Sequence, residues 1–358
     1  MKIAVILGTR PEIIKMAPVI KELERKKADF FILHTGQHYS YELDEVFFEQ
    51  LTLPRPEYNL DVGSGSHGEA TGKMLIGIEK TLKEAKPDAV LVEGDTNSIL
   101  AGALAAAKLG IRVGHVEAGL RSYDRTMPEE INRVLTDHIS DYLFAPTPQA
   151  REILRGEGIP GEKIFITGNT IVDAVNQNLE LSRSKADILD SLGLKPDGYF
   201  LVTLHRQENV DSRARFASIL EGLKRVAAEF NMPVFYPVHP RSKKMMAEFG
   251  LGPGNIVLAE PVDFLAFLQL ESRARLILTD SGGVQEEACI LKVPCVTLRD
   301  NTERPETVAV GANIIAGSKA ENIVRAVREM LKRERDWDNP FGDGRAAERV
   351  VATLEGKL

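Results

Sequence analysis

Short apolar runs alternate with helical patterns along most of the chain, and this alternation constrains the fold more than any other feature. It is typical of βαβ units, in which helices cover both faces of a parallel sheet. In the first half we predict strands at about 2–8, 30–35, 89–93, 111–116, 142–145 and 163–167, with helices such as 11–26, 97–109 and 128–141 between them. A second series begins near Tyr199, with strands at about 199–204, 233–238, 255–259, 275–279 and 293–298 and helices near 212–229, 241–249, 282–291 and 318–333.

Chain length and the position of a linker predict two domains. The 358 residues are about twice the usual length of one domain, and a hydrophobic fraction of 43% is enough for two cores. A polar, turn-rich stretch at 182–198 separates the two series. We therefore expect an α/β protein with one Rossmann-like domain over 1–182 and a second over 183–358. The sequence leaves open whether a final helix over 344–358 packs on its own domain or returns to the first.

Charge and composition exclude several classes of function. A net charge of −7 without a dense basic stripe argues against a nucleic-acid partner. Apolar runs stay below the roughly 18 residues that a membrane span needs, and the first residues resemble a strand rather than a signal peptide, so we expect a cytoplasmic protein. Cys289 and Cys295 are too few for a disulfide framework and lack metal-binding spacing, so we expect reduced, buried thiols and no metal.

The first candidate cluster follows the first strand. Gly8-Thr9-Arg10-Pro11-Glu12 joins a turn to a helix whose N-terminus, together with Arg10, would form an anion site. Lys15 lies one turn further along this helix, and a solvated surface charge explains it as well as a functional role does. Ligands of open α/β sheets bind beyond the carboxyl ends of the strands, which is where this cluster falls.

The strongest local motif is a strand, a Gly-Gly turn and a helix start at 274–287. The backbone N–H groups of Gly282 and Gly283 can approach phosphate oxygens closely, while Ser281 caps the helix or donates its hydroxyl. Glu287 lies one turn beyond Gly283, about 6 Å along the axis, which suits contact with ribose hydroxyls. An ordinary capped helix with acidic residues in its first turns is the alternative explanation.

Three carboxylates of the first half follow strands or open a helix. Asp95 and Glu117 come directly after predicted strands, so both should face the cleft between the domains. Glu129 follows a proline at a helix start, where helix electrostatics alone would favour an acid. Several carboxylates in one cleft can have different pKa values, which would leave one as proton acceptor and another as donor.

Basic residues follow strands of the second half in the same manner. His205 and Arg206 end one strand, His239 follows the next, and Arg304 lies in a loop after a later one. A lone histidine is more often structural, but each of these groups could contact a phosphate. The run Gly63-Ser64-Gly65-Ser66-His67-Gly68 matches a dinucleotide motif in spacing, yet it does not follow an apolar strand, so we interpret it as a mobile loop.

Taken together, these clusters resemble the non-hydrolysing UDP-N-acetylglucosamine 2-epimerase family, from Gly8 to at least Glu306. The matching signatures are Gly8-Thr9-Arg10-Pro11-Glu12 with Lys15, Gly94-Asp95-Thr96, His115-Val116-Glu117-Ala118-Gly119-Leu120-Arg121, Pro128-Glu129-Glu130 with Asn132-Arg133, Thr167-Gly168-Asn169-Thr170, His205-Arg206, Asp280-Ser281-Gly282-Gly283 with Glu287, and Thr302-Glu303-Arg304-Pro305-Glu306.

The resemblance implies a fold, a reaction and a set of site residues. The fold would be the glycosyltransferase-B arrangement of two domains around a cleft, usually in a homodimer. The reaction would be reversible epimerisation of UDP-N-acetylglucosamine at carbon 2, through loss of UDP to give 2-acetamidoglucal and its re-addition, without a cofactor. The implied catalytic residues are Asp95, Glu117, Glu129 and His205; the implied UDP contacts are Arg10, Lys15, Ser281, Gly282, Gly283, Glu287 and Arg304; and an activating site for a second UDP-N-acetylglucosamine would use Gln37, Arg206 and His239.

Three other functions stay open at this point. A hydrolysing epimerase would release UDP and free N-acetylmannosamine. A glycosyltransferase of the same fold would need an acceptor site and would not require three carboxylates in the first domain. A regulator that binds sugar nucleotides without turnover would not need them either.

Overall fold

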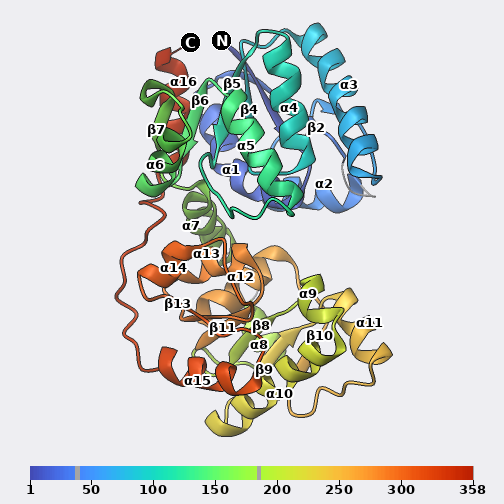
Figure 1. Cartoon of the computed structure of the whole chain (residues 1–358), viewed down its shortest axis with the longest axis vertical. Coiled ribbons are helices and arrows are strands. Elements are labelled where there is room, and N and C mark those ends of the chain that lie inside the picture. The colour runs from blue at the N-terminus through green and yellow to red at the C-terminus, as the bar shows by residue number, and fades with distance from the viewer. Residues whose placement is uncertain (37–40, 184–186, 358) are drawn as a thin grey trace. The chain divides into compact units, whose positions relative to one another are not determined.

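The chain forms two compact units in this computed structural model, which describes residues 1–36, 41–183 and 187–357 (Figure 1). Unit 1 comprises Met1–Ala174 together with Phe341–Leu358, and unit 2 comprises Val175–Pro340. The division falls within the helix α7 (Thr170–Arg183) instead of after it, where the sequence suggested the boundary. The polar linker marks the end of this helix, whereas its first turn packs with unit 1.

Unit 1 is built on a parallel sheet with strand order β3-β2-β1-β4-β5-β6-β7. Its strands are β1 (Lys2–Leu7), β2 (Asp29–His34), β3 (Tyr58–Asn59), β4 (Ala89–Glu93), β5 (Arg112–Val116), β6 (Tyr142–Ala145) and β7 (Ile164–Ile166). Its helices are α1 (Arg10–Arg25), α2 (Tyr41–Gln50), α3 (His67–Ala85), α4 (Asn97–Lys108), α5 (Pro128–Ile139), α6 (Pro148–Gly156), the first part of α7 and α16 (Ala346–Lys357), with a 3-10 turn at Gly161–Lys163.

Unit 2 repeats the same plan with strand order β10-β9-β8-β11-β12-β13, again parallel. Its strands are β8 (Phe200–Thr203), β9 (Val234–Pro237), β10 (Val257–Ala259), β11 (Leu276–Thr279), β12 (Cys295–Thr297) and β13 (Asn313–Ile315). Its helices are α8 (Ile188–Leu192), α9 (Gln207–Val210), α10 (Arg213–Phe230), α11 (Pro240–Glu248), α12 (Phe264–Arg273), α13 (Gly282–Ile290), α14 (Pro305–Ala309) and α15 (Ala320–Met330).

Apolar side chains on both faces of each sheet explain why helices cover both faces. In unit 1, β1 contributes Ala4 and Ile6 to a core that includes Met74 of α3 and Ile99 of α4. In unit 2, one core joins β8 to α10 and α15, and a second core joins the opposite face to α8, α12 and α13. The predicted fold class, α/β with two Rossmann-like parallel sheets, is confirmed. No helix within the described ranges is both long and apolar enough to cross a membrane.

The strand order reverses direction once in each sheet, between β1 and β4 in unit 1 and between β8 and β11 in unit 2. Helices that follow the strands on either side of such a switch point diverge to opposite faces, which leaves a crevice at the carboxyl ends of the strands. The residues that follow these four strands, Gly8, Gly94, Leu204 and Asp280, are therefore where a ligand site is expected in each unit.

The C-terminal segment belongs to unit 1, which answers a question that the sequence left open. Helix α16 packs against α1, and the carboxylate of Asp173 accepts hydrogen bonds from the backbone N–H groups of Ala346 and Ala347 at 3.2 and 3.0 Å. Arg349 donates to the carbonyl oxygen of Thr167 at 2.9 Å. Residues 341–358 thus complete the unit that residues 1–174 begin.

Several elements were missed because they are short or lack a strong period. Strands β3 and β13 have two and three residues, and α2 and α3 were not predicted. The run Gly63–Gly68, interpreted as a mobile loop, opens α3: the Ser66 hydroxyl accepts from the N–H of Glu69 at 3.4 Å, and Gly68 lies in the first turn. The glycine spacing there reflects a helix start.

Candidate functional site

The turn after β1 is shaped by close packing and by an internal carboxylate. A Cβ at Gly8 would lie 2.3 Å from Thr35 Oγ1 and 2.1 Å from Ser98 Oγ, so only glycine fits. The buried Glu12 carboxylate accepts from Gly8 N at 2.5 Å, Thr9 N at 3.2 Å and Thr96 Oγ1 at 2.6 Å. Burial raises the pKa of Glu12 to about 7, although these hydrogen bonds act in the opposite direction. We expected the N–H groups at the start of α1 to bind an external anion. Two N–H groups of this turn, those of Gly8 and Thr9, instead donate to the side chain of Glu12.

Lys15 of α1 lies between two buried acids. Its ammonium contacts the Glu117 carboxylate directly and lies 3.5 Å from Glu93 Oε1. Glu117, directly after β5, has φ 68°, a left-handed conformation that is rare outside glycine, and Asn169 Nδ2 donates to it at 3.4 Å. Strain of this kind, about 1–3 kcal/mol, persists where surrounding structure enforces it and is frequent at functional sites. The structure thus joins Lys15, expected among the UDP contacts, to a predicted catalytic carboxylate.

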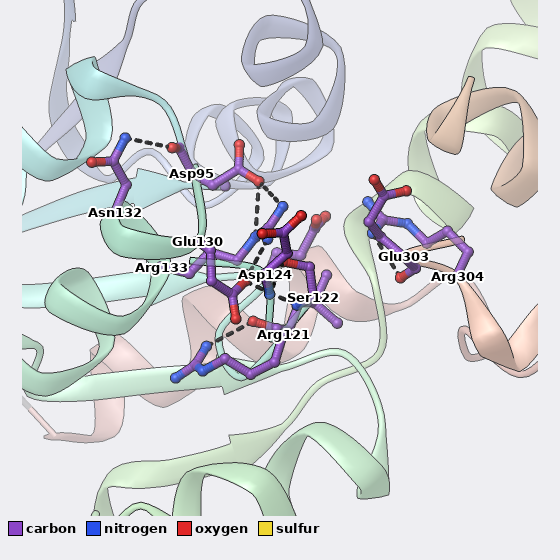
Figure 2. Close-up of polar contacts among 12 residues, drawn as sticks. Asp95, Arg121, Ser122, Asp124, Glu130, Asn132, Arg133, Glu303 and Arg304 are labelled. Atoms are coloured by element: carbon purple, nitrogen blue, oxygen red, sulfur yellow. Dashed lines mark hydrogen bonds and ion pairs between the residues drawn. The ribbon is translucent and has the colours of Figure 1, made fainter. Parts of the chain in front are cut away.

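Asp95, at the loop after β4, is held by a cation of α5. Arg133 donates to Asp95 Oδ2 from Nε at 2.9 Å and from Nη2 at 2.6 Å, and its Nη1 contacts Glu130 at 2.8 Å (Figure 2). Glu130 in turn accepts from the N–H and the hydroxyl of Ser122 at 2.9 and 3.0 Å. The neighbouring Glu129, a predicted catalytic residue, is half-buried. The contacts of Arg133 with Asp95 and Glu130 therefore fix the orientation of the Asp95 carboxylate.

A second buried network lies below Glu117 and was not predicted. His115 Nδ1 lies 2.6 Å from Asp137 Oδ1, and Arg121 Nη2 lies 2.7 Å from Asp137 Oδ2 and 2.6 Å from Glu157. Burial acts to raise the pKa of Asp137, but the neighbouring His115 and Arg121 hold it below its ordinary value. This charged network supports the loop that carries Glu117.

In unit 2 the switch point is organised around Asp280, directly after β11. Its buried carboxylate accepts from the backbone N–H of His205 at 3.1 Å, from that of Arg206 at 2.9 Å and from Asn209 Nδ2 at 3.2 Å, and it lies 3.3 Å from His205 Nδ1. Burial opposes ionisation, yet these donors keep the pKa of Asp280 below its ordinary value. The half-exposed His205 ring lies 5.9 Å from the ring of His239, centre to centre. One anion therefore fixes the turn that carries His205 and Arg206.

The N-terminus of α13 has two glycines that the protein's own packing does not require. A Cβ at Gly282 would come no nearer than 3.8 Å to another atom, and one at Gly283 no nearer than 3.9 Å. Neither residue has positive φ among the described backbone. Ser281 caps the helix by accepting from Val284 N at 3.5 Å. The open space over this turn suits close approach of an external group to the backbone.

Two acids of α13 lie beneath this turn. The buried Glu286 carboxylate contacts Arg304 Nε at 2.6 Å. Glu287, predicted to hold ribose, is buried beside Glu271 of α12, and burial together with Glu287 raises the pKa of Glu271 well above its ordinary value. Arg304, predicted to bind phosphate, thus forms an ion pair with α13, the helix that is predicted to bind UDP.

Within each unit the structure gathers most of the predicted site residues near the switch point. Arg10 is exposed, with its guanidinium 4.6 Å over the ring of Phe47. Gln37, predicted for an activating site, lies outside the described residues.

Sequence reasoning did not single out the buried acids Glu12, Glu93, Asp137 and Asp280 as parts of the site. Glu93 and Asp280 stand at strand ends, where the rule that located Asp95 could also have found them.

Comparisons with known proteins agree along nearly all of the chain. Residues 21–355 match the family model described as UDP-N-acetylglucosamine 2-epimerase. A curated relative from Methanocaldococcus jannaschii, named UDP-N-acetylglucosamine 2-epimerase, is 57% identical over 99% of both chains. One from Pseudomonas aeruginosa, named UDP-2,3-diacetamido-2,3-dideoxy-D-glucuronate 2-epimerase, is 43% identical over 99% of both.

Solved structures support the same assignment. The crystal structure of the Methanocaldococcus jannaschii UDP-GlcNAc 2-epimerase in complex with UDP-GlcNAc and UDP has a TM-score of 0.91 at 57% identity, covering 99% of this chain and 100% of that one. A lipopolysaccharide outer core galactosyltransferase, 16% identical over 100% of both chains with a TM-score of 0.55, shares the fold alone. The chain therefore belongs to the UDP-N-acetylglucosamine 2-epimerase family.

Proposed function

We propose that this protein interconverts UDP-N-acetylglucosamine and UDP-N-acetylmannosamine by inverting carbon 2, without net hydrolysis. The relative that is 57% identical over 99% of its length supports this substrate. The observation that carries the proposal is Glu117, an acid in a strained backbone conformation at the unit 1 switch point and in direct contact with Lys15. Such an arrangement is expected where a carboxylate must be fixed for proton transfer.

The chemistry requires a base and a stabilised leaving group. The carbon 2 proton of the sugar is not acidic, so we propose that a carboxylate removes it while the bond from carbon 1 to the UDP oxygen breaks. This step yields UDP and 2-acetamidoglucal. Re-addition of UDP to carbon 1, with a proton delivered to the opposite face of carbon 2, gives the epimer. The elimination itself provides the inversion, so no redox cofactor is required.

Unit 1 would supply the proton-transfer groups. Asp95, Glu117 and Glu129 are the candidates, and they differ in their surroundings. Asp95 is held by Arg133, and Glu117 is buried against Lys15, whereas Glu129 is half-buried on the first turn of α5. The three carboxylates thus differ in the groups that contact them, and separate acid and base roles require such a difference.

Unit 2 would hold the nucleotide. The N–H groups at the start of α13, with the Ser281 hydroxyl, would bind the diphosphate, and the helix dipole would favour its negative charge. Arg304, together with Arg10 of unit 1, is proposed to add phosphate contacts, and Glu287 to bind ribose hydroxyls. His205, fixed by Asp280, would donate to the departing phosphate oxygen as charge develops there.

Three further expectations from the family resemblance stay predictions. We propose a homodimer in the cytoplasm, and the two buried free thiols, Cys289 and Cys295, are consistent with a reducing compartment. We also propose that a second UDP-N-acetylglucosamine acts as an activator. The buried Arg206 Nε has no hydrogen-bond partner among the described residues, which supports Arg206 as part of such an anion site, and His239 lies near the adjacent His205.

Turnover in deuterated water tests the reaction. With UDP-N-acetylglucosamine as substrate, we expect UDP-N-acetylmannosamine carrying deuterium at carbon 2, detected by proton NMR and mass spectrometry. Release of free N-acetylmannosamine with stoichiometric UDP would instead establish the hydrolysing reaction. Absence of exchange and of any product would leave a sugar-nucleotide-binding regulator, and sugar transfer to an added acceptor a glycosyltransferase.

The Pseudomonas aeruginosa relative motivates a test of the substrate. Its name gives a 2,3-diacetamido uronate as the sugar, so a family member at 43% identity uses a different hexose. The same deuterium experiment with UDP-2,3-diacetamido-2,3-dideoxy-D-glucuronate, at equal concentration, measures the preference. We expect a higher kcat/KM for UDP-N-acetylglucosamine, and the reverse order would reassign the substrate while leaving the reaction type intact.

A further inference from the structure

Glu93 is a buried acid at the unit 1 switch point that the proposed reaction does not use. It is the last residue of β4 and only 1% exposed. Its Oε1 has no hydrogen-bond partner among the described residues, and Lys15 Nζ lies 3.5 Å away. An ionised carboxylate in such a place would have lost its hydration without gaining donors, which is strongly unfavourable.

The charged groups around Glu93 come from two neighbouring segments. Lys15 and Glu12 face it from α1, and Glu117 faces it from the residue after β5. Glu12 already accepts hydrogen bonds from two N–H groups of its own turn and from the Thr96 hydroxyl, and it adds negative charge when it is ionised. The single ammonium group of Lys15 is thus shared by two buried carboxyl groups, Glu93 and Glu117. It can neutralise only one carboxylate, so the charges balance when the other carboxyl group carries a proton.

The geometry decides which carboxyl group carries that proton. Glu117 has the direct contact with Lys15 and a second donor, Asn169 Nδ2, at 3.4 Å. Glu93 has the longer approach of Lys15, at 3.5 Å, and a side-chain hydrogen bond with Glu117, which requires a proton between the two carboxyl groups. The ionised form is therefore favoured at Glu117 and the protonated form at Glu93.

We propose that Glu93 is a protonated positioning residue, which as a neutral acid leaves Lys15 to pair with Glu117 and so keeps the proposed catalytic carboxylate charged. Burial raises the pKa of Glu93 well above its ordinary value; Lys15 opposes this effect, and Glu117 and Glu12 add to it. The protonation state of Glu93 follows from the structure alone. Only the consequence for catalysis rests on the proposed function.

Ionisation of Glu93 at high pH would change this balance. A second buried anion would then compete with Glu117 for Lys15 and pull the ammonium out of its present contact. The pH profile of kcat/KM is expected to contain an alkaline limb from this step, in addition to an acid limb from protonation of Glu117. Removing the ionisable group at position 93 should move the alkaline limb and leave the acid limb in place.

Infrared spectroscopy tests the protonation state without using activity. The wild-type protein at pH 7, in H2O and in D2O, is expected to show isotope-sensitive carboxylic acid C=O absorption, to which Glu12 and Glu271 also contribute, with one component that is missing from Glu93→Gln. Glu24→Gln, on an exposed position of α1, should leave the band intact and serves as the matched control. Identical acid bands in the wild type and Glu93→Gln would show that Glu93 is ionised and would overturn the proposal. Should Glu93→Gln fail to fold, Glu93→Met supplies a second neutral side chain of similar size.

The pH dependence of the deuterium exchange rate tests the consequence. Lys15→Gln should move the acid limb to higher pH by about one unit or more, since Glu117 loses its cation. Glu93→Gln should instead move the alkaline limb to higher pH by a similar amount. A shift of the acid limb to lower pH in Glu93→Gln would mean that Glu93 was charged beside Glu117, and an unchanged alkaline limb would also contradict the proposal. If the wild type shows no exchange, the proposed function fails, while the infrared result still decides the state of Glu93.

Discussion

The two switch points differ in how they accommodate buried charge. In unit 1, burial raises the pKa of Glu12 to about 7 and that of Glu93 well above its ordinary value, because it outweighs the three hydrogen bonds to Glu12 and the nearby ammonium of Lys15 beside Glu93. In unit 2, Asp280 receives several donors and its pKa is held down despite burial. Unit 1 thus contains acids whose pKa values are raised, that of Glu12 to about 7, whereas unit 2 contains an acid whose lowered pKa favours the anion that positions donors. Perturbed groups of the first kind are frequent in sites of proton transfer.

The sharpest way to break this comparison is to neutralise Glu117. Glu117→Gln should lower kcat by about 10²–10⁴, the usual contribution of a general acid or base. UDP affinity, measured by calorimetry, should change by less than about threefold, because the nucleotide is assigned to unit 2. Glu84→Gln on the exposed surface of α3 is the control. Retained turnover, or an equal loss of UDP binding, would refute the division of roles.

The next effect concerns the pH dependence of stability through Glu12. Its folded pKa of about 7 lies above its ordinary value of 4.5, so its contribution to stability is fully present below about pH 4.5 and is lost as the pH rises through 7. At about 1.4 kcal/mol per pH unit, the interval from 4.5 to about 7 makes the loss at most about 3.5 kcal/mol.

Glu12→Gln removes this titration while it keeps an acceptor for Gly8 N. From pH 5 to pH 8, the variant should therefore gain stability relative to the wild type, measured as the difference in urea midpoints. The exposed Glu24→Gln of the same helix should show no such gain. A constant difference between wild type and Glu12→Gln across this range would mean that Glu12 titrates normally.

Unit 2 should respond with the opposite sign. Because the pKa of Asp280 is lowered in the folded protein, its stabilisation is present above the ordinary pKa of 3.8 and is lost as the pH falls through the folded value. Asp280→Asn should cost about 1–3 kcal/mol of unfolding free energy at pH 7, since buried donors lose a charged acceptor. Asp300→Asn, with a mostly exposed side chain, is the control in urea unfolding. Equal midpoints for the two variants would remove Asp280 as the organising anion.

The smallest expected effect tests the open turn of α13. Gly283→Ala should weaken UDP binding at least about tenfold, because a methyl group would fill the space assigned to the diphosphate. Stability should be unchanged or slightly higher, since alanine is favoured over glycine in helices by about 1 kcal/mol. Gly68→Ala, in the first turn of α3 and also without neighbours, is the matched control. Undiminished UDP affinity in Gly283→Ala would place the diphosphate elsewhere.

Much of the framework was predictable because its signals are local. Each main strand is an apolar run of four to six residues, such as Phe200–Thr203 or Lys2–Leu7, and polar residues after strands identify the sheet edge where ligands bind. This rule selected Asp95, Glu117 and Ser281 as candidates, and their roles stay predictions. The two-residue strand β3 carries too little sequence to show a period.

The charge pattern of the site was not predictable in the same way. The burial of Glu93 depends on pairing of β4 with β5, which places Glu93 beside Val116 and next to the turn that carries Glu117. Burial by the surrounding fold raises the pKa of Glu12, and the hydrogen bond that most opposes this comes from Thr96, eighty-four positions along the chain. Such contacts between distant segments decide proton affinity, and no period or motif encodes them.

The return of residues 341–358 to unit 1 has a consequence for the order in which the molecule can mature. During synthesis, the whole of unit 2 is translated before α16 exists, so α1 must wait for its helical neighbour until unit 2 has been made. A nascent chain would therefore expose an incomplete first unit while unit 2 is translated, although most of that unit is made first.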